Sequence, residues 1–224
     1  MSTAKKTKQR TEAPRLGRDD WLDAAYLAVV EGGFDQVRVL TLADTLGVTR
    51  GSFYWHFSDH AELLQALLQR WQKREIDADL ALQAETTDDP QADLMHLLDA
   101  ALARGGADLK DMRFELALRG LGRRDPAVAK MLVEVDEARM SLLESKFGRL
   151  IGDPQRATEL AVLFYLAITG GIQALARPAS NARVAAYIRG VIADHLIRRQ
   201  APEPPPAPKS PKRKPAKAPD RVKR

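Results

Sequence analysis

Apolar residues recur at intervals of three and four through most of the chain between residues 19 and 199. In residues 19–30, for example, Leu22, Tyr26 and Val29 fall on one face of a helix. Between residues 19 and 199 no run of alternating β-branched residues is long enough to form a strand. The periodicity therefore predicts an all-α protein.

Aspartate, glycine and proline predict where these helices begin and end. Two very short helices meet at Gly47, and a long helix is expected after Asp59, which can cap it together with Glu62. Pro126 and Pro154 each follow an aspartate, which is typical of the first position of a helix. The other helices are expected at about residues 91–104, 110–121, 126–148, 154–176 and 180–199.

The charges are distributed unevenly, although the formal net charge of the chain is only +5. Residues 1–18 carry six Lys or Arg and one Glu, and residues 200–224 carry eight Lys or Arg and two acids, so residues 19–199 are net acidic. Eight of the thirteen prolines also lie in residues 200–224, which predicts disorder there. Two flexible basic arms favour a polyanionic partner, although the C-terminal one could serve solubility alone.

The sequence lacks the features of several classes of protein. It has no cysteine, no apolar run near the roughly 18 residues of a membrane span, and no secretory signal behind its basic N-terminus. It has no glycine-rich phosphate loop and no convincing nucleophile–base pair, so we expect neither an enzyme nor a cofactor. His56 and His60 have the spacing of a helical metal pair but straddle a predicted helix break, so we expect no metal site.

Residues 47–57, GVTRGSFYWHF, hold four aromatic residues in a chain whose aromatic content is 6%. With the preceding segment they fit a helix-turn-helix, because Ala43 lets two short helices approach closely and Gly47 suits the positive φ of the turn. Thr41 and Thr49 are candidate caps of the two helices. The apolar residues that can hold the pair together are Leu42, Leu46, Val48 and Phe53.

The second short helix is expected to have two different faces. At about 100° per residue, Phe53 and Phe57 point toward the core, opposite an arc formed by Arg50, Gly51, Tyr54 and Trp55. Exposed aromatic rings are costly to hydrate unless a partner covers them, so this arc has the character of a binding face. Such a helix can enter the major groove of DNA, where Arg50 could donate to guanine. The alternative is a packed helix junction without a partner.

The segment and its surroundings resemble the N-terminal domain of the TetR family of bacterial transcriptional regulators. The resemblance covers about residues 19–70 and rests on the spacing of GGF, TLADTLGVTRGSFYWHF and DHAELLQALL. It implies a three-helix DNA-binding head on a helical body that dimerises through its last two long helices and holds an inducer. The DNA-binding candidates are Arg38, Thr41, Thr49, Arg50, Gly51, Ser52, Tyr54, Trp55, His56 and His60.

Two positions depart from the family's pattern. His60 stands where the family commonly has a phosphate-binding lysine, so we expect this contact to be weaker or sensitive to pH. Arg38 stands where the family often has a serine or threonine before its second helix, so the N-cap assigned to that helix is in doubt. Arg38 could itself hold a phosphate.

The last two long helices are candidates for a dimer interface. Residues 158–176 are apolar nearly all round, and residues 180–199 combine an apolar stripe with a stripe of small residues. Small residues allow close approach of a partner subunit, whose twofold axis predicts a palindromic operator; the alternative is a buried helix of a monomer. The interface candidates are Leu163, Ala167, Gly170, Ala174, Ala182, Ala186, Gly190 and Ala193.

Candidates for a ligand pocket are spread over the body. They are Trp71, Met95, His96, Met112, Phe114, Arg119, Phe164, Tyr165 and Gln173. Each could instead belong to the core or the surface, and Glu115 with Arg119 has the spacing of an ordinary helix surface pair. The sequence does not identify the ligand.

These observations favour a cytoplasmic homodimeric repressor that binds double-stranded DNA at a palindromic operator, leaves it when a small-molecule inducer binds, and has no membrane partner. The expected parts are a basic arm (1–18), a helix-turn-helix domain (19–58), a ligand-binding and dimerisation domain (59–199) and a disordered tail (200–224). The main alternative is an architectural DNA-compacting protein that acts through its basic tails. A third hypothesis is a helical small-molecule-binding protein or enzyme whose head has lost DNA binding.

Overall fold

The computed structural model describes residues 16–104, 109–175 and 181–200, and within them the side chains of all but residues 104, 172–175 and 181–184. Regular structure in these ranges is entirely helical, which confirms the expected all-α fold. The α-helices are α1 (Arg18–Gly32), α2 (Val39–Leu46), α3 (Arg50–Phe53), α4 (His60–Ala84), α5 (Pro90–Arg104), α6 (Lys110–Gly122), α7 (Pro126–Ile151), α8 (Pro154–Leu175) and α9 (Asn181–Val191). The expected basic arm and Pro/Lys-rich tail lie almost wholly outside the described residues.

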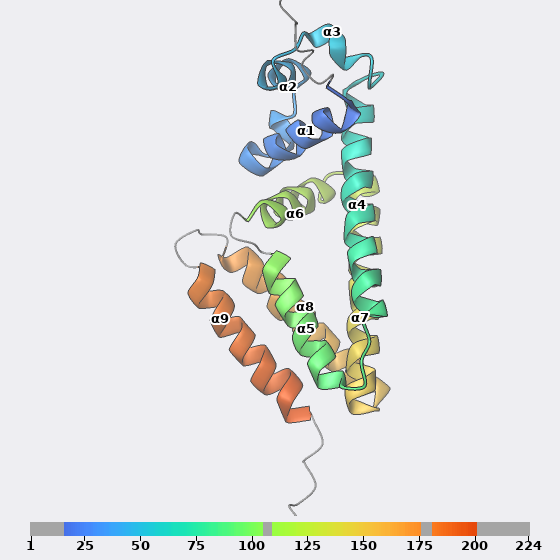
Figure 1. Ribbon diagram of the computed structural model, residues 1–224, viewed down its shortest axis with the longest axis vertical. Coiled ribbons are helices and arrows are strands. Elements are labelled where there is room, and N and C mark those ends of the chain that lie inside the picture. Colours follow the sequence, from blue (N-terminus) through green and yellow to red (C-terminus); the bar gives the residue numbers. More distant parts are fainter. Residues whose placement is uncertain (1–15, 105–108, 176–180, 201–224) are drawn as a thin grey trace, which may run out of the picture.

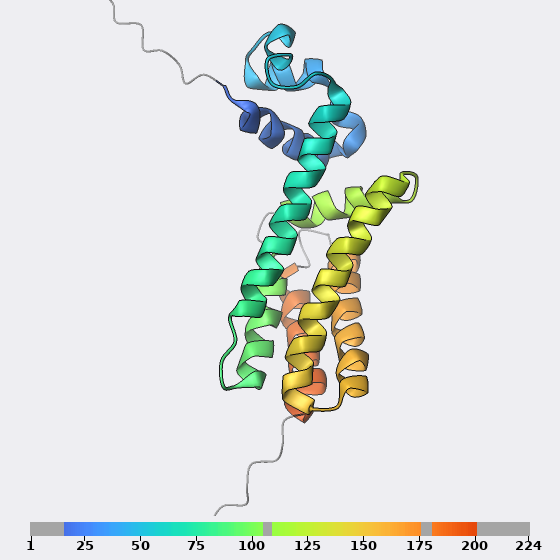
Figure 2. The same ribbon diagram turned by 90° about the vertical axis from the view of Figure 1, so that its right-hand side faces the viewer.

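The molecule is elongated, with a small head above a larger body (Figure 1). We call α1 to α3 and the first turns of α4 the head, and the remaining helices the body. The long helix α4 runs from the head down one side of the body, where it packs along α7 (Figure 2). Helix α6 crosses directly beneath α1, so α4 and α6 are the two elements that connect the halves.

The helix ends follow the expected capping chemistry at three positions. Asp59 accepts a hydrogen bond from the Glu62 backbone N–H at 2.8 Å, Asp125 from Ala127 at 2.9 Å, and Asp153 from the backbone of the second residue of α8 at 3.0 Å. Gly47 ends α2 with φ at 68°, the left-handed conformation expected of the turn.

The expected threonine caps of the helix-turn-helix are wrong. Helix α2 begins at Val39, so Thr41 lies inside it, and the N-cap is Arg38, whose side chain makes no cap hydrogen bond. Thr49 does occupy the N-cap of α3, but its hydroxyl caps nothing. Instead Ser52 Oγ donates to the Thr49 carbonyl at 2.7 Å, which stabilises the same turn from the other side.

The C-terminal helix is not regular over its whole expected length. Helix α9 ends at Val191, and a wider π-helical stretch over Ile192–Ile197 and a short 3₁₀ turn over Arg198–Gln200 follow it. Ile192, Ala193 and Ile197 are all buried in the body. A π-helical stretch shifts the side-chain register, and here it keeps these three residues on the core side.

Buried apolar side chains form two clusters. The upper cluster joins the head to α6 and α7 and includes Trp21, Phe53, Trp71 and Phe114. The lower cluster lies among α5, α7, α8 and the C-terminal helix, around Phe147. No helix in the described part of the chain is long and apolar enough to cross a membrane.

Candidate DNA-binding face and ligand cavity

The second helix of the helix-turn-helix is short but continues as tight turns. Helix α3 ends at Phe53, and backbone hydrogen bonds from Tyr54 to Gly51, from Trp55 to Ser52 and from His56 to Phe53 extend it. Phe57 N–H also donates to the Phe53 carbonyl, at 3.1 Å. The whole aromatic segment is therefore one ordered helical unit.

Two phenylalanines anchor this unit to the head. Phe53 and Phe57 are 0% and 2% exposed, and their rings stack with centroids 5.4 Å apart. Trp21, from α1, packs against Phe53 in a T-shaped arrangement, with ring centroids 5.3 Å apart. Such aromatic contacts fix the orientation of α3 on α1.

The opposite face of the unit carries the exposed aromatic residues, as expected. Tyr54 is 51% exposed and Trp55 is 87% exposed. Arg50 Nη2 donates to the Tyr54 hydroxyl at 3.1 Å, and its guanidinium carbon lies 5.9 Å from the centre of that ring. The arginine is thus held on the outer face of α3 by the side chain one turn later.

The remaining DNA-binding candidates surround this face. Arg38, Thr41, Thr49 and Gly51 are exposed, whereas Ser52 and His56 are half-buried. Arg38 Nε donates to the Asp35 carbonyl at 3.1 Å, which holds the side chain at the start of α2.

His60 makes a contact that the sequence did not predict. Its Nε2 lies 2.6 Å from the Val37 carbonyl oxygen, which can only accept, so Nε2 is the donor. The ring therefore connects the start of α4 to the loop before α2. Among the residues that the structure describes, no group of three or more His, Cys, Asp or Glu side chains is arranged to hold a metal ion.

The body contains a cavity of about 120 Å³. Four predicted pocket residues, Met112, Arg119, Phe164 and Tyr165, line it. Its other walls are apolar side chains from α4 to α8 together with a group of charged ones. The lining residues are Glu75, Asp79, Leu82, Leu97, Ala101, Asp111, Met112, Glu115, Leu116, Arg119, Arg139, Leu142, Leu143, Phe164, Tyr165, Ile168 and Thr169.

The other pocket candidates do not line this cavity. Trp71 and Phe114 belong to the upper apolar cluster, with ring centroids 6.3 Å apart, because they face the head rather than the body. Met95 packs against the lower cluster, and His96 is an exposed residue whose Nε2 lies 3.1 Å from Glu85. The side chain of Gln173 lies outside the described residues.

Five charged residues of the cavity wall were not among the predicted pocket residues: Glu75, Asp79, Asp111, Glu115 and Arg139. Glu75 and Asp79 are 8% and 4% exposed, and Arg139 is also largely buried. The sequence did contain a signal, because Trp71, Glu75 and Asp79 are spaced by four and fall on one helix face. Acidic residues on the buried face of a long helix indicate a polar site in the interior.

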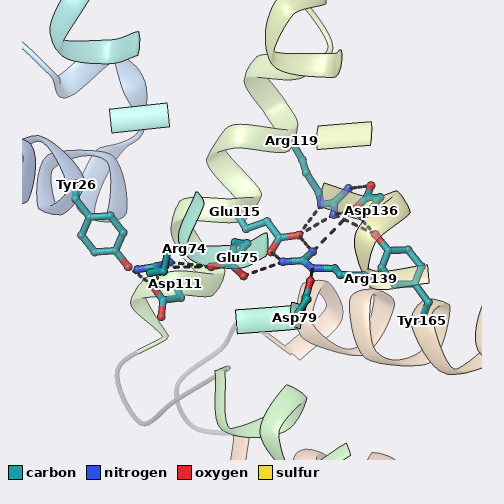
Figure 3. Close-up of polar contacts among 10 residues, drawn as sticks. All are labelled: Tyr26, Arg74, Glu75, Asp79, Asp111, Glu115, Arg119, Asp136, Arg139 and Tyr165. Atoms are coloured by element: carbon teal, nitrogen blue, oxygen red, sulfur yellow. Dashed lines mark hydrogen bonds and ion pairs between the residues drawn. The ribbon is translucent and has the colours of Figure 1, made fainter. Parts of the chain in front are cut away.

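These residues belong to a continuous network of ion pairs (Figure 3). Arg139 contacts Glu75 at 3.0 Å and Glu115 at 2.9 Å. Arg119 contacts Glu115 and Asp136, both at 2.7 Å. Arg119, a predicted pocket residue, and Glu115 are therefore half-buried members of the cavity wall, and the alternative of an ordinary surface pair does not hold.

The network ends in a tyrosine hydroxyl on each side. Tyr165, on α8, donates to Asp136 at 2.6 Å. At the other end Tyr26, on α1, donates to Asp111 at 2.6 Å, and Asp111 pairs with Arg74 at 2.8 Å (Figure 3). Polar contacts thus run without a break from the head to the far wall of the cavity.

Burial and neighbouring charge shift the pKa values of the network. Burial alone would raise the pKa of Glu115, but hydrogen bonds and attraction from Arg139 and Arg119 hold it below its ordinary value. Burial would lower the pKa of Arg119, but Asp136 and Glu115 raise it above the ordinary arginine value. Both groups are therefore ionised at neutral pH.

The interface candidates on α8 and the C-terminal helix differ in exposure. Leu163 is 50% exposed, Gly170 and Ala186 are exposed, and Ala167 and Gly190 are half-buried. Ala193 is a correction, because it is 1% exposed and packs in the subunit's own lower core, where no partner can reach it. The side chains of Ala174 and Ala182 lie outside the described residues.

Known proteins similar to this chain are DNA-binding regulators. Residues 22–67 match the family model of bacterial regulatory proteins, tetR family. The HTH-type transcriptional regulator TtgR of Pseudomonas putida is 32% identical over 94 residues, which are 42% of this chain and 43% of TtgR. The HTH-type transcriptional repressor BepR of Brucella suis is 28% identical over 69% of this chain and 77% of the repressor. The chain therefore matches less than half the length of TtgR.

Solved structures support the fold beyond the head. A transcriptional regulator from Saccharomonospora viridis, solved in complex with choline, has a TM-score of 0.67 and 18% identity, covering 80% of this chain and 97% of that one. The helix-turn-helix head and the all-helical body together have the fold of this structure. Residues 22–67, which form most of the head, therefore carry the sequence pattern of the tetR family of bacterial regulatory proteins.

Proposed function

We propose that this protein is a dimeric transcriptional repressor that binds a palindromic operator through α3 and leaves it when a small molecule enters the body cavity. The observation that carries the proposal is the outer face of α3, where Tyr54 and Trp55 are exposed and Arg50 is held beside them. Because its partner would be chromosomal DNA, we also propose a cytoplasmic location.

The chemistry of this face suits the major groove of DNA. Arg50 can donate two hydrogen bonds to a guanine edge, and the Tyr54 hydroxyl can donate to a phosphate. Trp55 offers an apolar surface for a thymine methyl or a sugar edge. The buried rings of Phe53 and Phe57 support these side chains from behind, so little conformational entropy is lost on binding.

Exposed apolar side chains on α8 and α9 support the proposed dimer. Val162, Leu163 and Leu166 are 40%, 50% and 59% exposed on α8, and Tyr187 and Val191 are 72% and 41% exposed on α9. A row of large apolar residues exposed on adjacent helices is typical of a protein–protein interface. A twofold axis there would present two copies of α3 to one duplex.

The cavity supports a ligand-responsive repressor because polar contacts join its wall to α1 of the head. A ligand that moves Arg139 or Glu115 would disturb the contacts that reach Tyr26 through Glu75, Arg74 and Asp111. A coupling free energy of about 1–3 kcal/mol between the two sites is typical of allosteric proteins.

The direct test is the affinity of an Arg50→Ala variant for duplex fragments of the native promoter. Loss of a guanine contact is expected to weaken operator binding by about 5- to 150-fold without lowering the melting temperature. Lys130→Ala is the matched control, because it removes the same charge from an exposed site on α7. Equal operator affinity in wild type and Arg50→Ala would exclude α3 as the reading helix.

A further inference from the structure

The charged side chains that line the cavity are paired with one another. Glu115 contacts Arg119 at 2.7 Å and Arg139 at 2.9 Å. Arg139 also contacts Glu75 at 3.0 Å, and its Nε lies 4.0 Å from a carboxylate oxygen of Asp79. The charges of these five residues are therefore directed along the wall, from one side chain to the next (Figure 3).

Two residues behind the wall extend this pairing. Arg74 contacts Asp111 at 2.8 Å and Glu75 at 3.1 Å. Asp136 contacts Arg119 at 2.7 Å. Each charged residue that lines the described cavity thus has an opposite charge within 4.0 Å.

A charged ligand would have to compete with these pairs. An anion would have to take a guanidinium group from a carboxylate, and Arg119 already donates to Glu115 and Asp136 from all three of its nitrogens. A cation would have to take a carboxylate from a guanidinium group, and both oxygens of Glu115 already accept from arginine. An ion that enters a cavity loses its hydration and binds well only where new partners replace the water. The paired wall therefore favours an uncharged ligand.

The rest of the wall is apolar. Leu97 and Ala101 come from α5, Leu116 from α6, and Phe164 and Ile168 from α8. Phe164 and Leu97 also belong to the lower apolar cluster, which supports them from behind. A ligand in contact with these side chains gains free energy mainly by burying apolar surface of its own.

The volume of the cavity limits the size of the ligand. It is about 120 Å³, which is below the roughly 300–1,000 Å³ of sites for drug-sized molecules. An apolar protein cavity of about 150 Å³ is large enough to hold benzene. The cavity therefore suits a molecule of about one ring.

We propose that the cavity binds an uncharged, mainly apolar molecule of the size of a single ring, which lies against Leu97, Phe164 and Ile168. As the effector of the repressor this ligand rests on the function proposed above, whereas its charge class and its size rest on the cavity alone.

The first test compares three one-ring probes that differ in charge. Benzyl alcohol, benzylammonium and benzoate are each titrated into the full chain by calorimetry, at neutral pH and without DNA. We expect benzyl alcohol to bind at least about tenfold more tightly than either ion, because an ion gives up hydration that the paired wall does not replace. Equal or tighter binding of either ion, or no binding of benzyl alcohol at millimolar concentration, would overturn the proposal.

A fourth probe tests the size of the ligand. The molecule para-phenylbenzyl alcohol adds a second ring to the same alcohol, and this ring exceeds the volume of the cavity. It should bind at least about tenfold more weakly than benzyl alcohol, because an overpacked interior is destabilised. Affinity equal to that of benzyl alcohol would contradict the assigned size.

Cavity-filling variants locate the bound alcohol. Ala101→Leu and Ile168→Phe place extra atoms in the cavity from α5 and from α8, and each should weaken binding of benzyl alcohol at least about tenfold. Ala103→Leu is the matched control, because Ala103 is an exposed residue of α5 that does not line the cavity. If one filling variant fails to fold, the other decides, and unchanged binding in a folded filling variant would show that the alcohol binds elsewhere.

A charge variant tests the physical reason for the preference. Arg119→Met takes a guanidinium group from Glu115 and Asp136, so the preference for benzyl alcohol over benzylammonium should shrink. Arg156→Met breaks an exposed pair on α8 outside the cavity and should leave that preference intact. An unchanged preference in folded Arg119→Met would mean that the paired charges do not select the ligand.

The operator complex separates this inference from the proposed function. Binding of benzyl alcohol that leaves the operator complex intact would support the ligand class and contradict release by this cavity. Operator binding by a protein that ignores benzyl alcohol would overturn the ligand class and leave the DNA-binding proposal standing.

Discussion

The head and the body bury different kinds of side chain. The head packs Trp21, Phe53 and Phe57 in a closely fitted aromatic core, and its charges lie outside. The body buries Glu75 and Arg139 beside a cavity. Apolar packing fixes one arrangement, whereas buried ion pairs repay their desolvation only while their partners stay in place. The proposed function assigns DNA reading to the closely packed head and the response to a ligand to the body.

Removing a core ring from each half tests whether the two halves fail differently. Phe53→Ala and Phe147→Ala both truncate a side chain that is 0% exposed, so each should lower the free energy of unfolding by about 4 kcal/mol. Only Phe53→Ala should abolish operator binding at temperatures where the variant is folded, because this ring supports α3. Urea unfolding and fluorescence anisotropy with operator DNA measure the two effects. Loss of operator binding in Phe147→Ala but not in Phe53→Ala would contradict the assignment of DNA binding to the head.

The buried network predicts that replacing two arginines of the body lowers the free energy of unfolding by different amounts. Arg139→Met removes the guanidinium group that contacts both Glu75 and Glu115, and should lower the free energy of unfolding by about 3 kcal/mol. Arg156→Met breaks an exposed pair with Glu159 and should cost at most about 1 kcal/mol. Equal values from urea unfolding would show that the network does not stabilise the body.

Acid should weaken the body through the same network. A carboxylate whose pKa is lowered by folding stabilises the folded state above its ordinary pKa, and this contribution is lost as the pH falls through the folded value. For Glu115 the loss therefore begins as the pH falls below about 4.5, its ordinary value. Glu115→Gln should flatten this part of the stability profile measured by urea unfolding at several pH values. A profile as steep as that of wild type would mean that other groups control the acid transition.

The head was predictable from sequence because its determinants are local. Gly47, the aspartate at position 59 and the alternation of buried and exposed aromatic residues in α3 lie within about a dozen residues of one another. The Thr41 cap failed because α2 begins earlier, at Val39, with an extended arginine before it.

The cavity was only partly predictable, because its wall is assembled from distant segments. Glu75 and Arg139 are separated by 64 residues, and no local pattern pairs them. Arginine and glutamate on a helix normally indicate a solvated face, so Arg139 and Glu115 did not stand out. Phe114 was assigned to the pocket by its apolar character, but apolar character does not tell which of two cores a ring joins.

Quenching of tryptophan fluorescence tests most directly whether the outer face of α3 is kept for DNA. The chain has three tryptophans, and Trp21 and Trp71 are 0% and 4% exposed while Trp55 is 87% exposed. Acrylamide should therefore quench one component of the tryptophan fluorescence in the free protein. This component should be missing in Trp55→Phe. Operator duplex should protect it, and an unrelated duplex of equal length at the same salt concentration should not. If Trp55 stays equally open to acrylamide while the operator is bound, the duplex is held elsewhere.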